Sequence, residues 1–192
     1  MEFKDLVRDR RSCRAFESSP VPDEQVAAIL EAGQWAPSPL NLQPWEFIVV
    51  TDPAVKTQIR EAAEDARQGV IDGGGPGWAG KYAMTFIEDA PVLIVVAFNP
   101  AKGGLGDFFN QRQGAMQAAS ACVQNMMLAA ADMGFATLWF TFFDPVKVAG
   151  ALKIPENLDV AAVIPVGRPA GSADAPPRKA LKVYRDYYGN TE

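Results

Sequence analysis

The chain has 192 residues, of which 48% are hydrophobic and 21% are charged, and these values are ordinary for a globular protein and exclude a disordered chain. Its 18 basic and 23 acidic side chains give a formal net charge of -5, which argues against general binding to nucleic acid or to anionic membranes. The sequence contains no histidine, so serine–histidine triads, histidine metal sites and histidine acid–base catalysis are excluded.

The cysteines and the apolar stretches indicate the compartment. Cys13 and Cys122 lie far apart and form no metal-like spacing, so we expect two reduced thiols and no metal site. The longest apolar stretches, such as 91–98, are far shorter than the roughly 20 residues of a membrane-spanning helix. The N-terminus also lacks the pattern of a secretory signal. We therefore expect a cytoplasmic protein with one domain over residues 1–192.

Hydrophobic periodicity predicts interleaved helices and strands. In chain order we expect a helix over 3–9, a helix started by Pro22 and Asp23 and closed by Pro37, a strand over 46–51, a helix over about 54–67, a mobile loop over 69–80, a strand over 92–98, a long buried helix over about 112–133, a strand over 135–140, a helix near 146–152 and a strand over 160–166. The order lacks strict βαβ regularity. It predicts an α+β sandwich with a central, mostly antiparallel or mixed sheet flanked by helices.

The first segment with chemical potential is Arg10-Arg11-Ser12-Cys13-Arg14, which follows the first predicted helix. Three fixed cations and a hydroxyl in five residues can hold a phosphate or another compact anion by charge-assisted hydrogen bonds. The alternative is a solvated patch whose cations offset the dipole of a helix end, with Ser12 as a simple cap. Cys13 has no histidine base, which favours a packed residue over a nucleophile.

The second segment runs from Pro37 to Trp45 and contains three prolines. Prolines fix the backbone, while Ser38, Asn41 and Gln43 offer neutral polar groups. An ordinary connector that leads Trp45 into the core would need fewer polar groups. Together the two segments suggest that the chain binds a phosphorylated cofactor. The glycine clusters match neither nucleotide-binding fingerprint.

The order and spacing of several segments resemble the FMN-dependent nitroreductase family. The resemblance is carried by 10–16, 20–22, 29–32, 36–38, Asn41, 43–45, 47–50, 89–96, 124–130, 138–140, 164–167 and 178–179. It implies an α+β fold in an interlocked homodimer, with one FMN at each end of the interface contacted by both chains. It also implies that the flavin carries the chemistry, which fits a chain without histidine.

The resemblance implies roles for particular residues. Arg10, Ser12 and Arg178 would hold the FMN phosphate with help from Arg11 and Lys179, and Arg14 would face the pyrimidine side of the flavin. The turn with Pro37, Ser38, Pro39, Asn41 and Gln43 would come from the partner subunit.

A second group of implied contacts concerns the flavin face and the acceptor. Trp139, Phe140, Thr141 and Phe142 would pass one face of the flavin, and a backbone N–H near Thr141 or Phe142 would contact its N5. The bulk of residues 140–143 departs from the family's usual small residues and could narrow the pocket. Phe108, Phe109 and Asn110 are expected to shape the acceptor pocket.

The resulting hypothesis is an FMN-dependent NAD(P)H oxidoreductase that passes hydride through flavin N5, in ping-pong fashion, to a nitroaromatic, quinone or related small-molecule acceptor. Two alternatives stay open. One is a flavin-binding or ligand-sensing protein of the same fold with little turnover. The other is a specialised offshoot that acts as a dehydrogenase, a dehalogenase or a flavin-degrading enzyme.

Overall fold

The fold is built around one antiparallel sheet. The computed structural model describes residues 2–171 and 175–190. Four strands pair in the order β1-β2-β4-β3, with β1 at Trp45–Val50, β2 at Val92–Phe98, β4 at Asp159–Gly167 and β3 at Ala136–Thr137. All three strand pairs are antiparallel, as expected, and all seven residues of β2 are buried. A strand buried on both faces needs a layer of helices on each side.

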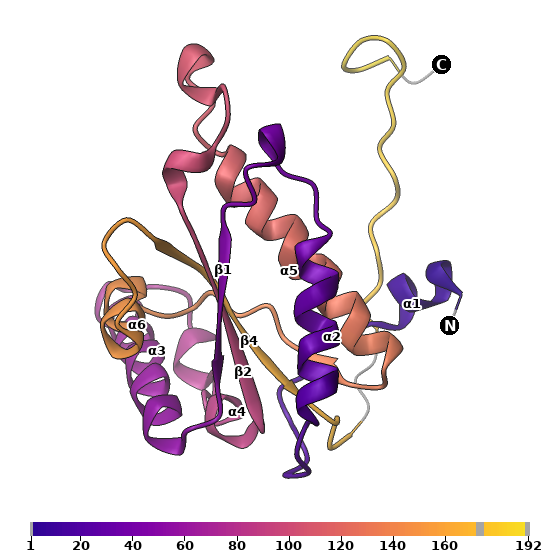
Figure 1. The fold of residues 1–192 in the computed structure, drawn as a ribbon. Helices are drawn as coiled ribbons and strands as arrows, with labels where there is room; N and C mark the ends of the chain where they lie inside the picture. Colours follow the sequence, from indigo (N-terminus) through magenta and orange to yellow (C-terminus); the bar gives the residue numbers. More distant parts are fainter. Residues whose placement is uncertain (1, 172–174, 191–192) are drawn as a thin grey trace.

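Helices cover both faces of this sheet (Figure 1). On one face lie α2 (Asp23–Gln34) and α5 (Gly114–Asp132), which share a core with Ile94, Val96 and Ile164. On the other lie α3 (Pro53–Asp72), α4 (Phe86–Asp89) and α6 (Pro145–Leu152), which pack against Leu93, Val95 and Val163. The alternation of β2 side chains between two cores follows from the period of two in a strand. The predicted α+β sandwich is confirmed.

The helix α5 is buried along most of its length, as its alanine- and methionine-rich sequence predicted. It packs closely on α2 because Gly33 has no side chain: an added Cβ there would lie 2.7 Å from Met126 Cγ and 2.9 Å from Cys122 Sγ. This close packing makes the α2–α5 pair a rigid unit, so it holds the segments at the two ends of α5 at a fixed separation.

Two predicted boundaries are wrong. The strand expected over 135–140 is regular only at Ala136–Thr137, and Phe140 forms an isolated bridge with Val163. Leu138 and Trp139 connect the two pairings, and their side chains enter opposite cores. The loop expected from residue 69 begins later, because α3 continues to Asp72 and ends where the Gly73 N–H donates to the Gly69 carbonyl.

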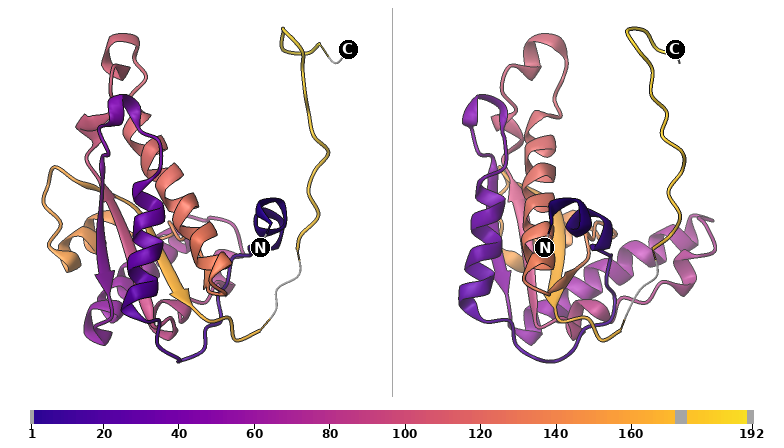
Figure 2. Two further views of the ribbon diagram at one scale, coloured as in Figure 1. Left: turned by 45° about the vertical axis from the view of Figure 1, so that its right-hand side comes forward. Right: turned by 90° about the vertical axis from the view of Figure 1, so that its right-hand side faces the viewer.

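The two end segments of the described chain differ in how they pack. The helix α1 (Phe3–Asp9) lies beside the end of α5, where Leu6 and Ala131 line one cavity, whereas the segment 175–190 stands away from the helical layers (Figures 1 and 2). The segment leaves apolar side chains in solvent, with Leu181 92% and Tyr188 93% exposed. Among the described residues, no helix combines the length and apolarity needed to cross a membrane.

Four short 3-10 helices lie between the main elements of the described chain. They are η1 at Pro39–Asn41, η2 at Ala79–Lys81, η3 at Pro100–Lys102 and η4 at Gly106–Phe109.

Candidate functional site

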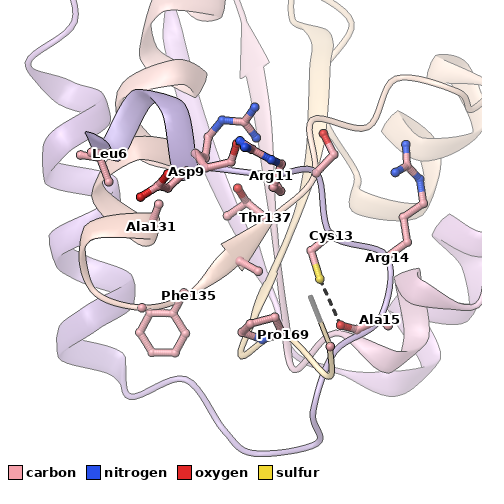
Figure 3. Close-up of a pocket in the computed structure, with 15 residues that line it drawn as sticks. Leu6, Asp9, Arg11, Cys13, Arg14, Ala15, Ala131, Phe135, Thr137 and Pro169 are labelled. Carbon is pink, nitrogen blue, oxygen red and sulfur yellow. Dashed lines mark hydrogen bonds between the residues drawn. The ribbon is translucent and has the colours of Figure 1, made fainter. Parts of the chain in front are cut away.

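A cavity of about 690 Å³ lies between α1, the C-terminal end of α5 and the strand β3 (Figure 3). Its lining consists of Leu6, Asp9, Arg10, Arg11, Ser12, Cys13, Arg14, Ala15, Ala131, Gly134, Phe135, Ala136, Thr137, Pro169 and Gly171. The whole arginine-rich segment is therefore part of one cavity wall.

Backbone pairing holds that segment in place. Ser12 forms a parallel bridge with Thr137, and the Cys13 N–H donates to the Thr137 carbonyl at 2.9 Å. Further along, the Ala170 N–H donates to the Ala15 carbonyl at 2.9 Å, beside a bridge between Phe16 and Pro169. The segment thus extends the edge of the sheet next to β3, which fixes the direction of its side chains.

Three polar atoms in this cavity wall are buried and have no hydrogen-bond partner among the described residues: Arg10 Nη1, Arg11 Nε and Thr137 Oγ1. Such atoms are rare in folded proteins because each carries a desolvation cost of about 1 to 3 kcal/mol. Burial lowers the pKa of the Arg10 guanidinium, and the positive charges of Arg11 and Arg178 lower it further. An anion bound between these side chains would satisfy the donors and relieve the repulsion.

Three other groups of the segment, on Arg11, Cys13 and Arg14, already have partners. Arg11 Nη1 donates to the Arg8 carbonyl and to the Arg10 carbonyl at the end of α1, so the helix-end interpretation is correct for part of this side chain. The thiol of Cys13 donates to the Ala15 carbonyl at 3.0 Å and lies at the cavity (Figure 3). The Arg14 Nε donates to the Tyr82 hydroxyl at 2.8 Å.

The second predicted segment satisfies itself. The Gln43 N–H donates to Ser38 Oγ at 3.0 Å, and Gln43 Nε2 donates to Asn41 Oδ1 at 3.0 Å. Gln34 Nε2 donates to Gln43 Oε1 at 2.6 Å, and the indole of Trp45 donates to Gln34 Oε1 at 2.9 Å. The predicted polar groups therefore hold the turn in shape.

The backbone of this turn is strained. Leu40, Asn41 and Gln43 have φ of 50°, 54° and 43°, in the left-handed region that side chains with a Cβ seldom adopt. The turn packs on the glycine-rich segment before α5: Gly104 has φ +78°, and an added Cβ there would lie 2.7 Å from Pro39 Cβ. Rigidity of this kind maintains an unusual shape.

The two segments lie at opposite ends of α5 (Figure 1). The turn contacts the beginning of α5 through Pro39 and Gly114, whereas the arginine-rich cavity includes Ala131 near its end. A helix of 19 residues is roughly 28 Å long. Within one chain, the two segments therefore do not share a small ligand.

Residues 108–110 lie at the turn's end of the molecule. A second cavity of about 380 Å³ includes Pro39 and Phe109 in its lining. Phe108 is 80% and Phe109 76% exposed, and Asn110 adopts a left-handed conformation. The structure thus groups these residues with the proline-rich turn, and the arginine-rich cavity does not include them.

The segment 139–142 has a divided role. Phe140 is buried between Phe86, at 5.2 Å between ring centroids, and Phe143, at 5.7 Å, and its backbone pairs with Val163. Thr141 is exposed, whereas Trp139 and Phe142 are half-buried. The bulk of Phe140 and Phe143 therefore fills the core.

The two predicted C-terminal cations, Arg178 and Lys179, differ in their surroundings. Arg178 lies near enough to Arg10 for its charge to lower the pKa of that guanidinium. Lys179 is exposed on the extended segment. The structure thus brings three of the predicted phosphate ligands, Arg10, Ser12 and Arg178, to one side of the molecule.

Two residues at this site were not predicted. Thr137 is 1% exposed with an unpartnered hydroxyl, and its position as the polar residue within the apolar run 135–140 was an available signal. Tyr82, which contacts Arg14, carries no signal in sequence because it is separated from Arg14 by 68 positions.

Comparison with known proteins shows the family of the chain. The family model described as the nitroreductase family matches residues 7–168. The chain belongs to the nitroreductase family. It is 31% identical to the iodotyrosine deiodinase of Haliscomenobacter hydrossis, over 91% of this chain and 82% of that protein. It is 27% identical to the NADH dehydrogenase of Thermus thermophilus, over 88% of each.

The fold comparison agrees with this family. The structure of oxidised iodotyrosine deiodinase bound to FMN and 3-iodo-L-tyrosine superposes with a TM-score of 0.85 at 23% identity, covering 96% of this chain and 99% of that chain. At this identity the likeness concerns the nitroreductase fold.

Proposed function

We propose that this member of the nitroreductase family is an FMN-dependent oxidoreductase. The observation that carries the proposal is the set of buried, unpartnered Arg10 Nη1, Arg11 Nε and Thr137 Oγ1 atoms around one cavity. The cavity lining holds three arginines, Arg10, Arg11 and Arg14, and one carboxylate, Asp9, and this excess of cationic donors suits a phosphate group. The choice of FMN as the phosphate-bearing group is supported by the likeness to the structure of iodotyrosine deiodinase bound to FMN.

In this proposal the cations divide the work along the cavity. Arg10, Ser12 and Arg178 hold the phosphate, and Arg11 and Lys179 add positive potential. Arg14 lies four residues further along the segment, at most about 14 Å away in extended backbone, and faces the pyrimidine side of the flavin. A fixed cation there stabilises the negative charge that develops on reduction.

The proline-rich turn completes the site in a homodimer. Its separation from the cavity along α5 means that Ser38, Pro39 and Asn41 reach a shared cofactor only from a second chain. Exposed apolar side chains near the turn, such as Leu40 at 69% and Leu105 at 60%, favour such an interface. Phe108, Phe109 and Asn110 belong to the same end and would shape the acceptor pocket of the partner's site.

When bound, FMN relays a hydride from NADH or NADPH to a nitroaromatic, quinone or related acceptor. The chain's contribution is to orient the flavin and exclude water. A backbone N–H at Thr141 or Phe142 would face flavin N5. The nicotinamide donor is suggested by the likeness to the NADH dehydrogenase of Thermus thermophilus.

The test is anaerobic stopped-flow mixing of FMN-loaded protein with NADH or NADPH, followed by a quinone or a nitroaromatic. The proposal expects bleaching of the flavin absorbance near 450 nm by one nucleotide and its return with the acceptor. Bound FMN that neither nucleotide reduces would contradict the oxidoreductase assignment and favour the flavin-sensing alternative.

A second candidate is reductive dehalogenation of a halogenated phenol, favoured by the 31% identity with a protein named iodotyrosine deiodinase. Two electrons and a proton would replace the carbon–halogen bond with carbon–hydrogen and release halide. Iodide release from 3-iodotyrosine by dithionite-reduced protein tests this directly. Absence of iodide with intact quinone turnover would reject this second candidate.

A further inference from the structure

We infer that Tyr82 is a positioning residue that holds Arg14 in its orientation toward the flavin and thereby raises the reduction potential of bound FMN. The inference rests on the proposed function, since it concerns the affinity of the cavity for reduced FMN. It adds a residue from the segment between α3 and α4 to a site whose other components lie near the N-terminus and near β3.

The contact between Arg14 and Tyr82 has two parts. The Arg14 Nε donates to the Tyr82 hydroxyl at 2.8 Å, and Arg14 Cζ lies 5.4 Å from the centroid of the Tyr82 ring. A free arginine side chain on the surface samples many rotamers, and fixing it costs up to about 2 kcal/mol of entropy. The tyrosine therefore pre-orients a guanidinium that is otherwise exposed.

The hydroxyl of Tyr82 orients Arg14 without neutralising it. A carboxylate partner would cancel most of the field that the guanidinium exerts on a neighbouring ligand, whereas a neutral phenol leaves the positive charge available. Arg14 lines the cavity together with Arg10 and Arg11. A cation in this place attracts the reduced flavin, which carries more negative charge, more strongly than the oxidised flavin.

The Tyr82 ring is itself held by three aromatic neighbours. Its centroid lies 6.0 Å from Trp78, 6.2 Å from Phe142 and 6.2 Å from Phe86, each in an edge-to-face arrangement. Phe86 is 1% exposed and belongs to the core. The core thus fixes the Tyr82 ring, and the hydroxyl of that ring fixes the orientation of Arg14.

Tyr82 also touches the second predicted flavin contact. Phe142, whose backbone is one of the two candidates for flavin N5, packs on both Tyr82 and Trp78. One side chain therefore links two segments that approach the flavin from different parts of the sequence. A displacement of Tyr82 would disturb both.

The test compares the two-electron reduction potential of bound FMN in the wild type, Tyr82→Phe, Arg14→Gln and the double variant. Tyr82→Phe keeps the ring and removes the hydroxyl. We expect it to weaken binding of reduced relative to oxidised FMN by about threefold to tenfold, which corresponds to a potential lower by about 15 to 30 mV. In the double variant we expect no shift beyond that of Arg14→Gln, because Tyr82 acts through Arg14.

Tyr188→Phe is the matched control. It also removes one phenolic hydroxyl, but from a residue that is 93% exposed and outside the cavity lining, and it should leave the potential unchanged. Should Tyr82→Phe fold poorly, Arg14→Lys replaces it: lysine keeps the charge but lacks the Nε–H that donates to Tyr82, so the potential should again fall.

A second readout needs no cofactor. In FMN-free protein labelled with ¹⁵N-arginine, the Nε–H resonance of Arg14 should be protected from exchange in the wild type and lose that protection in Tyr82→Phe. An unchanged potential in Tyr82→Phe, or a double variant whose shift is the sum of the two single shifts, overturns the inference. A wild type that binds no FMN would instead contradict the proposed function, while the resonance still reports the Arg14–Tyr82 contact.

Discussion

The arginine-rich cavity and the proline-rich turn each contain polar residues and lie at opposite ends of α5. They differ in whether those polar groups have hydrogen-bond partners within the protein. In the turn, Ser38, Asn41 and Gln43 bond to one another and to the neighbouring glutamine Gln34. In the cavity, buried atoms of Arg10 and Arg11 have no partner among the described residues. The polar groups of the turn bond to one another, whereas the cavity has unpartnered donors that, in our proposal, bind an anion.

This difference separates a structural use of polar residues from a binding use. A closed hydrogen-bond network stabilises a shape, here a backbone with three strained residues, and contributes its outer surface to any contact. Unpaired buried cations cost stability and are retained where a ligand repays that cost. Each prediction below perturbs one of the two regions or the helices between them.

The largest expected effect is the difference in thiol reactivity between Cys13 and Cys122. Burial raises the pKa of the Cys122 thiol to about 12, about three units above the ordinary value of 9.0, so near pH 8 its thiolate is about 1000-fold scarcer than that of a normal cysteine. Cys13 lines the cavity. Iodoacetamide at pH 8 should modify Cys13 first, as read by peptide mass spectrometry.

Saturating FMN should protect Cys13 from iodoacetamide, and the buried Cys122 should stay unmodified at pH 8 in both samples. Preferential labelling of Cys122 at pH 8 would contradict the closed packing of α2 on α5. Equal labelling of Cys13 with and without bound FMN would contradict the placement of the ligand in the cavity.

Arg10→Ala should break the cavity. Loss of one charged hydrogen-bond donor costs about 1.5 to 3 kcal/mol of binding, a 10- to 150-fold weaker affinity for FMN, measured by quenching of FMN fluorescence. The FMN-free variant should melt no earlier than the wild type, because burial and neighbouring positive charges disfavour this guanidinium.

Arg8→Ala is the control for Arg10→Ala, since Arg8 is exposed on the same helix end and lies outside the cavity lining. Its affinity for FMN should match the wild type. An equal loss of FMN affinity in both variants would show that the arginines act only as a general basic patch.

Gln34→Ala should break the turn without touching the cavity. It removes the acceptor of the Trp45 indole, whose residue is 5% exposed, and a partner of Gln43. We expect a loss of about 1 to 2 kcal/mol, which lowers the melting temperature by roughly 2 to 8 °C in a chain of this size. Gln68→Ala, which removes a surface contact with Asp72, should change it by less than about 2 °C.

Thr137→Val, a change in the cavity wall, should have the smallest effect on FMN affinity and on stability. The hydroxyl is buried without a partner, so its replacement by a methyl group of similar shape should leave the melting temperature of FMN-free protein unchanged or higher. If the ligand uses this hydroxyl, affinity falls by about 0.5 to 1 kcal/mol, roughly twofold to fivefold. A less stable FMN-free variant would show that Thr137 is a structural residue.

Much of the fold was accessible from the sequence because its signals are local. The strand Val92–Phe98 has the expected bounds, and the helix Asp23–Gln34 begins at the residues that its proline start indicates. The strand expected over 135–140 is interrupted because only Ala136 and Thr137 pair with β4 before the chain meets it again at the isolated Phe140–Val163 bridge. Such long-range pairing is not encoded in β-propensity.

The site was only half accessible. Arg10, Ser12 and the turn are contiguous motifs, whereas Thr137 and Tyr82 join the site through the sheet and the aromatic cluster. No spacing rule relates Arg14 to a tyrosine 68 residues later. The bulk at Phe140 and Phe143 suggested a narrowed pocket, but both rings are buried, where they pack on each other and Phe140 also packs on Phe86.

The most direct test of the central claim compares FMN with riboflavin, which lacks the phosphate. If the unpaired cations of the cavity hold that phosphate, FMN should bind the purified wild-type protein at least about 100-fold more tightly than riboflavin, and Arg10→Ala should close most of this gap. Equal affinities for the two flavins, or no binding of either, would contradict the account.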